Sequence, residues 1–196
     1  MESLADSAHV IRAVSESLRS LIRSHIPALA PESAVVFDSP AEIEADGETR
    51  LSLYLYQAET NVYLRNLPPV LQRGASSMQL TPPPLVVDLM YLMVPYAKSA
   101  ELELVLLDQL VQLLHDYPAL QGEWLHPVLR QTGNEPIPIT PDAVSIDTLR
   151  HIWAGFPNKA YKVTKVYLLS PVRIPSVRRV QQVPMVLHSD VQVVQE

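Results

Sequence analysis

The sequence predicts an α/β (α+β) fold in which helices pack on a β-sheet. Two apolar segments with strand-like patterns, residues 51–58 and 85–94, are the first reason. In the first segment apolar and polar side chains alternate, because successive residues of a strand point to opposite faces of a sheet. The second segment is apolar on both faces except at Asp88, which is typical of a central strand. Two amphipathic helical patterns, over residues 4–25 and 99–117, are the second reason.

The composition fits one globular domain, since 196 residues are enough to bury a sizeable core. The net charge of −6 argues against a general nucleic-acid-binding protein, which would carry a basic face. The absence of cysteine excludes disulfides and thiolate sites and is compatible with the cytosol. Glu2 and Asp6 occupy an N-terminus without a basic region ahead of an apolar run, so we expect no signal peptide. No run approaches the roughly 20 apolar residues of a membrane span.

The N-terminal part predicts one helix and two strands. In residues 4–25, apolar side chains recur at spacings of three and four, and Pro27 ends the pattern. We expect this helix to pack on the sheet. Residues 34–38 predict a short strand, and residues 39–50 form an acidic, turn-like segment. The expected arrangement is a long-looped hairpin between this short strand and the strand 51–58.

A long polar and proline-rich connection, residues 59–81, separates the two central strands. Loops of this length inside a compact domain are uncommon, and they are usually functional or disordered. Within the connection, residues 63–71 include several apolar side chains that need cover. That cover is either the loop's own domain or a neighbouring subunit. Residues 81–84, Thr-Pro-Pro-Pro, predict a stiff extended lead-in to the strand that follows.

The C-terminal half predicts two capped helices. Ser99 is the expected N-cap of the helix 99–117, and acidic residues in its first turns suit the helix dipole. The predicted buried stripe of this helix comprises Leu102, Val105, Leu106, Leu107, Leu110, Leu113 and Leu114. Ser145 is the expected N-cap of the helix 145–156. The predicted buried face of this second helix comprises Ile146, Leu149, Ile152 and Trp153.

Three further segments complete the predicted domain. Residues 122–131 predict a short helix or strand, and residues 137–140 predict an edge strand, where proline is tolerated. The last long strand is expected over residues 160–172. We therefore predict one domain, residues 1–172, followed by an extended C-terminal arm, residues 173–196. The arm is expected either to add a strand to another chain or to form a disordered terminus.

The sequence contains no motif that carries catalysis or holds a cofactor. It has no phosphate-binding loop, no GxSxG elbow and no HExxH pair, and its six histidines are scattered without metal-ligand spacing. Asp88 is either a catalytic carboxylate or a structural one, bonded to backbone groups or paired with an arginine or lysine. We favour the structural role, because a buried charge needs a partner. We expect no enzymatic activity, no metal and no cofactor.

An ordered series of motifs resembles a known family. The series is SLYLYQ…N…LRN, then PPPL, then VDLMYLMVPY, then LLHDYPAL, and it runs from the first helix to a strand ending near residue 174. It is similar to the cap, or tail-terminator, proteins of extracellular contractile injection systems, the phage-tail-like particles of the antifeeding-prophage and virulence-cassette type. The resemblance implies a phage tail-terminator-like fold with a single mixed, largely antiparallel sheet flanked by helices.

The resemblance also implies a function as a structural cap. Such a cap forms a ring on the distal end of the inner tube and sheath, where it ends their polymerisation and stabilises the particle. The implied partners are further copies of the chain, in a homohexameric ring, and the tube and sheath proteins, with no nucleic acid and no membrane. The implied location is the cytoplasm during assembly, and afterwards a released or cytosolic particle.

Expected contact residues lie in the connection 59–81 and in the C-terminal arm. Arg65 and Asn66 match the LRN motif of the family. The expected contacts to another subunit, the tube or the sheath are Tyr63, Leu64, Arg65, Asn66, Leu67, Arg173, Arg178 and Arg179.

An alternative function from another class is a non-enzymatic α/β module that binds a small molecule or a peptide. An apolar pocket roofed by the connection 59–81 would support that alternative. The two hypotheses differ in assembly, because a cap protein should form one sixfold ring, whereas a binding module should be a monomer with a closed pocket.

Overall fold

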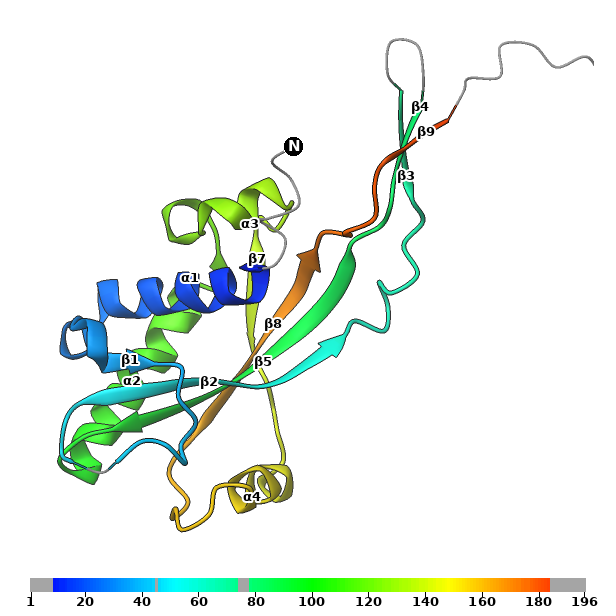
Figure 1. Cartoon of the computed structure of the whole chain (residues 1–196). Coiled ribbons are helices and arrows are strands. Elements are labelled where there is room, and N and C mark those ends of the chain that lie inside the picture. The colour runs from blue at the N-terminus through cyan, green and yellow to red at the C-terminus, as the bar shows by residue number, and fades with distance from the viewer. Residues whose placement is uncertain (1–8, 45, 74–77, 184–196) are drawn as a thin grey trace, which may run out of the picture.

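The computed structural model describes residues 9–44, 46–73 and 78–183, and its centre is a six-stranded sheet (Figure 1). The strand order is β1-β2-β5-β8-β7-β6. All neighbouring strands are antiparallel except β1 and β2. The predicted mixed, largely antiparallel sheet flanked by helices is therefore confirmed. Its strands are β1 (Val35–Val36), β2 (Arg50–Thr60), β5 (Leu85–Tyr96), β6 (Ala119–Leu120), β7 (Ile137–Pro141) and β8 (Lys165–Ile174).

Strand β5 lies in the middle of the protein, with helices on both faces of the sheet. Leu89, Tyr91 and Met93 point into a core shared with α1 (Val10–His25), α2 (Ala100–Asp116) and α3 (Pro127–Gln131). The alternate residues Leu92, Val94 and Tyr96 point into a second core, which contains Trp153 of α4 (Ile146–Ala154). Burial on both faces explains why this strand is apolar except at Asp88.

A second sheet, which the sequence did not predict, occupies part of the connection 59–81. It has three strands in the order β3-β4-β9, namely β3 (Val70–Arg73), β4 (Met78–Thr81) and β9 (Gln181–Val183). Figure 1 shows this sheet projecting from one end of the main sheet. The expectation of a plain loop was wrong here because β3 is exposed along its whole length, so it shows no buried face that an alternation pattern would reveal.

The first two strands form no hairpin, contrary to expectation. Val35 pairs with Leu51 and Val36 with Ser52 in parallel register. The segment between β1 and β2 is long enough for the chain to return to the same end of the sheet, as a parallel pair requires. The Ser52 hydroxyl donates to the Asp38 carbonyl at 2.7 Å, which holds the returning chain against β2.

The chain between the long helices and strands forms short turns of 3-10 helix. These are η2 (Pro27–Leu29), η3 (Glu32–Ala34) and η4 (Gly122–Trp124). The predicted short element over residues 122–131 is thus η4 followed by α3. The predicted edge strand, β7, lies instead between β8 and the two-residue strand β6. Residues 160–164, predicted as strand, precede β8 and are not in a strand.

Both helix caps are confirmed, but the buried faces are narrower than predicted. The Ser99 side chain accepts from the Leu102 N–H at 3.4 Å, and the Ser145 side chain accepts from the Thr148 N–H at 3.1 Å. In α2 only Leu106, Leu110, Leu113 and Leu114 are buried. Leu102, Val105 and Ile146, all predicted to be buried, are exposed. Apolar residues occupy nearly every second position of α2, so their spacing does not single out one face.

A buried hydroxyl pair joins α1 to β5. The Tyr91 hydroxyl lies 2.8 Å from the Ser15 hydroxyl, and Ser15 itself donates to the Ile11 carbonyl at 3.2 Å. Because serine has one hydroxyl proton, Tyr91 is the donor to Ser15. Burial raises the pKa of Tyr91 to about 12, because the buried site disfavours the charged phenolate.

Replacing Tyr91 with Phe should lower the free energy of unfolding at pH 7 by about 1 kcal/mol, the contribution of one buried hydrogen bond. The wild-type protein should lose stability as the pH rises above 10, because tyrosine in the unfolded chain ionises there while folded Tyr91 stays neutral. The variant should lose less between pH 10 and 12, with a remainder from Tyr96, whose pKa burial also raises to about 12, and from Tyr56 and Tyr167, whose pKa values burial raises as well. Urea denaturation at pH 7 and pH 11 measures both effects; an unchanged alkaline loss would contradict the assignment.

Candidate assembly surface

Asn61 fixes the direction in which the chain leaves the main sheet after β2. Its side chain is buried, and its own N–H donates to the Val86 carbonyl at 2.9 Å. The Asn61 Oδ1 accepts from the N–H groups of Tyr63 and Leu64 at 3.0 and 2.9 Å. These local hydrogen bonds form a turn of the kind that asparagine favours. The first residues of the connection are therefore positioned by hydrogen bonds of Asn61, to β5 and to the backbone N–H groups that follow it.

Asp88 receives hydrogen bonds from the residue that follows β2 and from a residue of β8. The Asn61 Nδ2 donates to Asp88 Oδ1 at 2.9 Å, and the Ser170 hydroxyl donates to the same oxygen at 2.5 Å. A register shift between Val87 and Leu89 against β8 accompanies this position. The structural role expected for Asp88 is supported, but the expected partners were wrong, since they are an amide and a hydroxyl instead of a backbone group, arginine or lysine.

A second buried asparagine anchors the base of the C-terminal arm. Asn134 is fully buried; its Nδ2 donates to the Arg173 carbonyl at 2.7 Å and its Oδ1 accepts from the Arg173 N–H at 2.6 Å. Arg173 and Ile174 still belong to β8, so the predicted domain boundary after residue 172 falls inside this strand. The Arg173 side chain is half-buried, unlike those of Arg178 and Arg179, which are exposed.

The arm adds a strand to its own chain in the structure. Residues 181–183 form β9, which pairs with β4 in antiparallel register, with Met78 opposite Val183. The two alternatives for the arm were a strand added to another chain and a disordered terminus, whereas its described part adds a strand to the hairpin of its own chain. The remaining residues of the predicted arm, 184–196, lie outside the described residues.

We call the described residues 61–73, 78–84 and 175–183 the distal lobe. It contains the small sheet and the two segments that lead to it (Figure 1). Its exposed large apolar side chains are Val62, Tyr63, Val70, Leu71, Val177, Val180 and Val183. Tyr63 is 91% exposed, the highest value among these. Isolated exposed apolar residues are ordinary, but a cluster of this size is typical of a contact surface.

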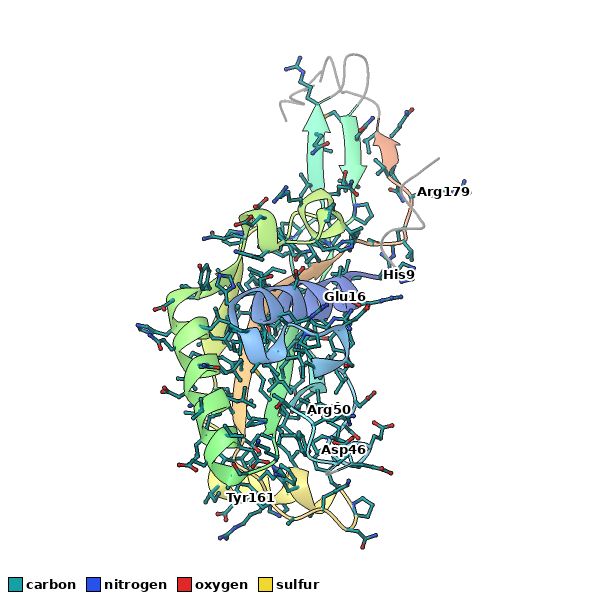
Figure 2. All side chains as sticks on the ribbon, turned by 90° about the vertical axis from the view of Figure 1, so that its left-hand side faces the viewer. His9, Glu16, Asp46, Arg50, Tyr161 and Arg179 are labelled. Atoms are coloured by element: carbon teal, nitrogen blue, oxygen red, sulfur yellow. The ribbon has the colours of Figure 1, made fainter. Side chains whose placement is uncertain are left out.

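The distal lobe also gathers most of the predicted contact residues. Tyr63, Arg65 and Asn66 are exposed, whereas Leu64 and Leu67 are half-buried. Arg178 and Arg179 approach the lobe from the arm, and Figure 2 shows Arg179 beside β9. Among the described residues, Arg65, Arg73, Arg178 and Arg179 form no ion pair. Of the predicted contact residues, Arg173 alone lies at the base of the lobe and not on it.

Three hollows on the described surface are lined by residues outside the connection 59–81. One lies beside α1 and is lined by polar residues such as Glu16, Arg19 and His126. Another lies beside α4, where Arg150 and Tyr161 line it. The apolar pocket that would support a small-molecule or peptide-binding module is therefore not found in these places.

No group of three or more histidine, aspartate or glutamate side chains in residues 9–44, 46–73 and 78–183 is arranged to hold a metal ion. Over the same residues, no helix has both the length and the apolar character needed to cross a membrane.

Comparison with known proteins identifies one family. The family described as the Pvc16 N-terminal domain matches residues 13–188. The PVC sheath/tube terminator of an extracellular contractile injection system, in its extended state, has a similar fold with a TM-score of 0.70. It is 17% identical over 95% of this chain and 64% of its own. No curated protein matches the chain.

A second solved structure is also similar. The tube-terminating cap of the anti-feeding prophage has a TM-score of 0.66 and is 16% identical, over 92% of this chain and 60% of its own. The chain therefore spans less than two thirds of the length of either solved protein. At these identities, the two likenesses establish a shared fold.

Sequence reasoning missed the residues that position the distal lobe. Asn61, Ser170 and Asn134 were not among the candidates, although a charged residue inside an apolar strand, such as Asp88, is a signal that polar partners must lie on adjacent strands.

Replacing Asn61 with Ala should lower the free energy of unfolding by roughly 2 kcal/mol, because Asp88 loses one donor and two backbone N–H groups lose their acceptor. The backbone amides of Tyr63 and Leu64 should exchange hydrogen faster than in the wild type. Asn66→Ala is the matched control, since Asn66 is exposed and should change stability by no more than about 0.5 kcal/mol. Equal effects of the two substitutions would show that Asn61 is not an anchor.

Proposed function

Because this chain belongs to the Pvc16 N-terminal domain family, we propose that it is a structural cap of a contractile, phage-tail-like injection particle. In this function it forms a ring on the distal end of the inner tube and sheath, ends their polymerisation and stabilises the particle. The family match over residues 13–188 carries the proposal. The fold shared with a sheath/tube terminator and with a tube-terminating cap supports it.

The distal lobe is the surface that we assign to assembly contacts. Its small sheet is built mainly from exposed residues and projects from the main sheet, so it contributes little to the core of its own domain. Its arginines and apolar side chains are available to partners. We assign the contacts to Tyr63, Leu64, Arg65, Asn66, Leu67, Arg178 and Arg179, with Arg173 at the base of the lobe.

The proposed assembly is a homohexameric ring. A ring uses head-to-tail contacts that join two different surfaces of the same subunit, and it closes when the rotation between neighbours is right. One face of the ring then meets the last layer of the tube and sheath. The cap acts by occupying that layer and not by catalysis. It assembles in the cytoplasm and remains part of the finished particle.

Adding the full-length protein to polymerising tube subunits from a particle of this kind should shorten the tubes and place a ring at one end, as seen by negative-stain electron microscopy. Arg65→Glu should reduce the fraction of capped ends about tenfold, which corresponds to a loss of about 1.4 kcal/mol in binding free energy. Arg150→Glu is the control for the charge change, because Arg150 is also exposed but lies on α4, where it pairs with Asp147. Tubes of unchanged length without end-bound protein would argue against the cap function.

A further inference from the structure

Charge is divided unequally along the protein. None of the 21 acidic residues falls within residues 60–87 or 171–189, whereas five of the 15 basic residues do. The rest of the chain therefore has ten basic and 21 acidic residues. The distal lobe lies entirely within these two segments. It carries Arg65, Arg73, Arg178 and Arg179 on its surface. The lobe is thus a basic surface on a protein that is otherwise strongly acidic.

An acidic surface with exposed apolar side chains lies on the first turns of α2. Leu104 and Val105 are 57% and 49% exposed on its outer side. Glu101 and Asp108 lie within three or four residues of them and so share their helix face. Both carboxylates are exposed, and neither forms an ion pair among the described residues. Glu103, in contrast, is already paired with Lys162.

An acidic turn increases the negative charge at this end of the protein. A side-chain carbon built on Gly47 would lie 3.8 Å from the Cβ of Lys98, which places the turn next to the start of α2. Arg50 pairs with two of the four carboxylates in this turn, Asp46 and Glu48, and Glu42 and Glu44 are the others. Figure 2 shows Asp46 and Arg179 toward opposite ends of the protein.

The basic and acidic surfaces of one chain are too far apart to touch. The distal lobe leads into β5 at Leu85, and α2 starts just after β5 ends at Tyr96. A strand rises about 3.3 Å per residue, so the 12 residues of β5 separate the two surfaces by roughly 35–40 Å. Any contact between the lobe and the outer face of α2 therefore joins two molecules.

We propose that the distal lobe of one copy docks on the outer face of α2 of the next copy, around Glu101, Leu104, Val105 and Asp108. The lobe offers arginines and apolar side chains, and the helix offers carboxylates and apolar side chains, so the two surfaces are complementary in both respects. Because they are different surfaces, the contact is heterologous and repeats head to tail. The inference rests on the proposed cap function, for which it supplies the contact between ring subunits.

A cysteine pair tests this contact directly, since the chain has no cysteine of its own. The full-length variant Leu104→Cys/Val177→Cys carries one thiol on each surface, both at exposed apolar positions. Mild oxidation should give a ladder of covalent multimers on a non-reducing gel, whereas each single variant can give only dimers. The control Ile146→Cys/Val177→Cys moves one thiol to an equally exposed position on α4. Equal ladders from the two pairs would overturn the proposal.

Charge reversal in the Leu104→Cys/Val177→Cys variant tests the electrostatic contribution to this contact. Arg178→Glu/Arg179→Glu and Glu101→Arg/Asp108→Arg should each reduce the multimer yield about tenfold, the change expected for 1.4 kcal/mol of contact free energy. Combining the four substitutions should restore the ladder, because the signs are again opposite. The same charge change at Glu32→Arg/Glu123→Arg, on η3 and η4, should leave the yield unchanged. Failure of the combined variant to recover would overturn the proposal.

The outcomes distinguish this contact from the cap function itself. Wild-type capping of tube ends without a specific ladder from the Leu104/Val177 pair would overturn the contact and leave the cap function standing. A specific ladder from a protein that never binds tube ends would support the contact and remove the cap function.

Discussion

The burial of β5 on both faces is the constraint on which the rest of the structure depends. Alternate side chains of this strand belong to two different cores, one under α1, α2 and α3 and the other under α4. Each fully buried side chain of leucine size contributes about 1.5–3 kcal/mol, so a strand buried on both sides fixes its own register strongly. β2 and β8 pair with its two edges, and the helices pack on the two faces of the sheet.

The same strand also carries the polar cluster at the base of the distal lobe. Asp88 interrupts its apolar pattern next to the buried Val86 and Val87, and the hydrogen bonds of Asn61 and Ser170 satisfy this carboxylate. A buried polar cluster of this kind is stable only when its groups are paired, which makes it sensitive to the loss of any one member. The distal lobe is therefore positioned by a few hydrogen bonds at its base, and most of its side chains are exposed.

The sequence predicted the parts of the fold that have one buried face and a clear period. The strands 51–58 and 85–94, both serine caps and the family resemblance could be identified, because alternation, capping and ordered motifs are local signals. The small sheet was not predictable, since β3 is exposed at all four positions and β9 pairs with a strand about 100 residues earlier. Leu102 and Val105 were placed in the core because apolar spacing alone does not distinguish a core from a surface that binds another molecule. Asn61 and Asn134 were missed because their partners lie on other elements of the folded chain.

The pairing of β4 with β9 has a consequence for the order of events during synthesis. Ribosomes add roughly 5–20 residues per second, so the partner of β4 emerges several seconds after β4 itself. By then the strands and helices of the main core have all been made. The three-stranded sheet of the lobe is thus completed after the main core, and a chain interrupted before residue 181 lacks the strand that completes it. Under the proposed cap function, this order of synthesis leaves the lobe surface unfinished until the main core has been made.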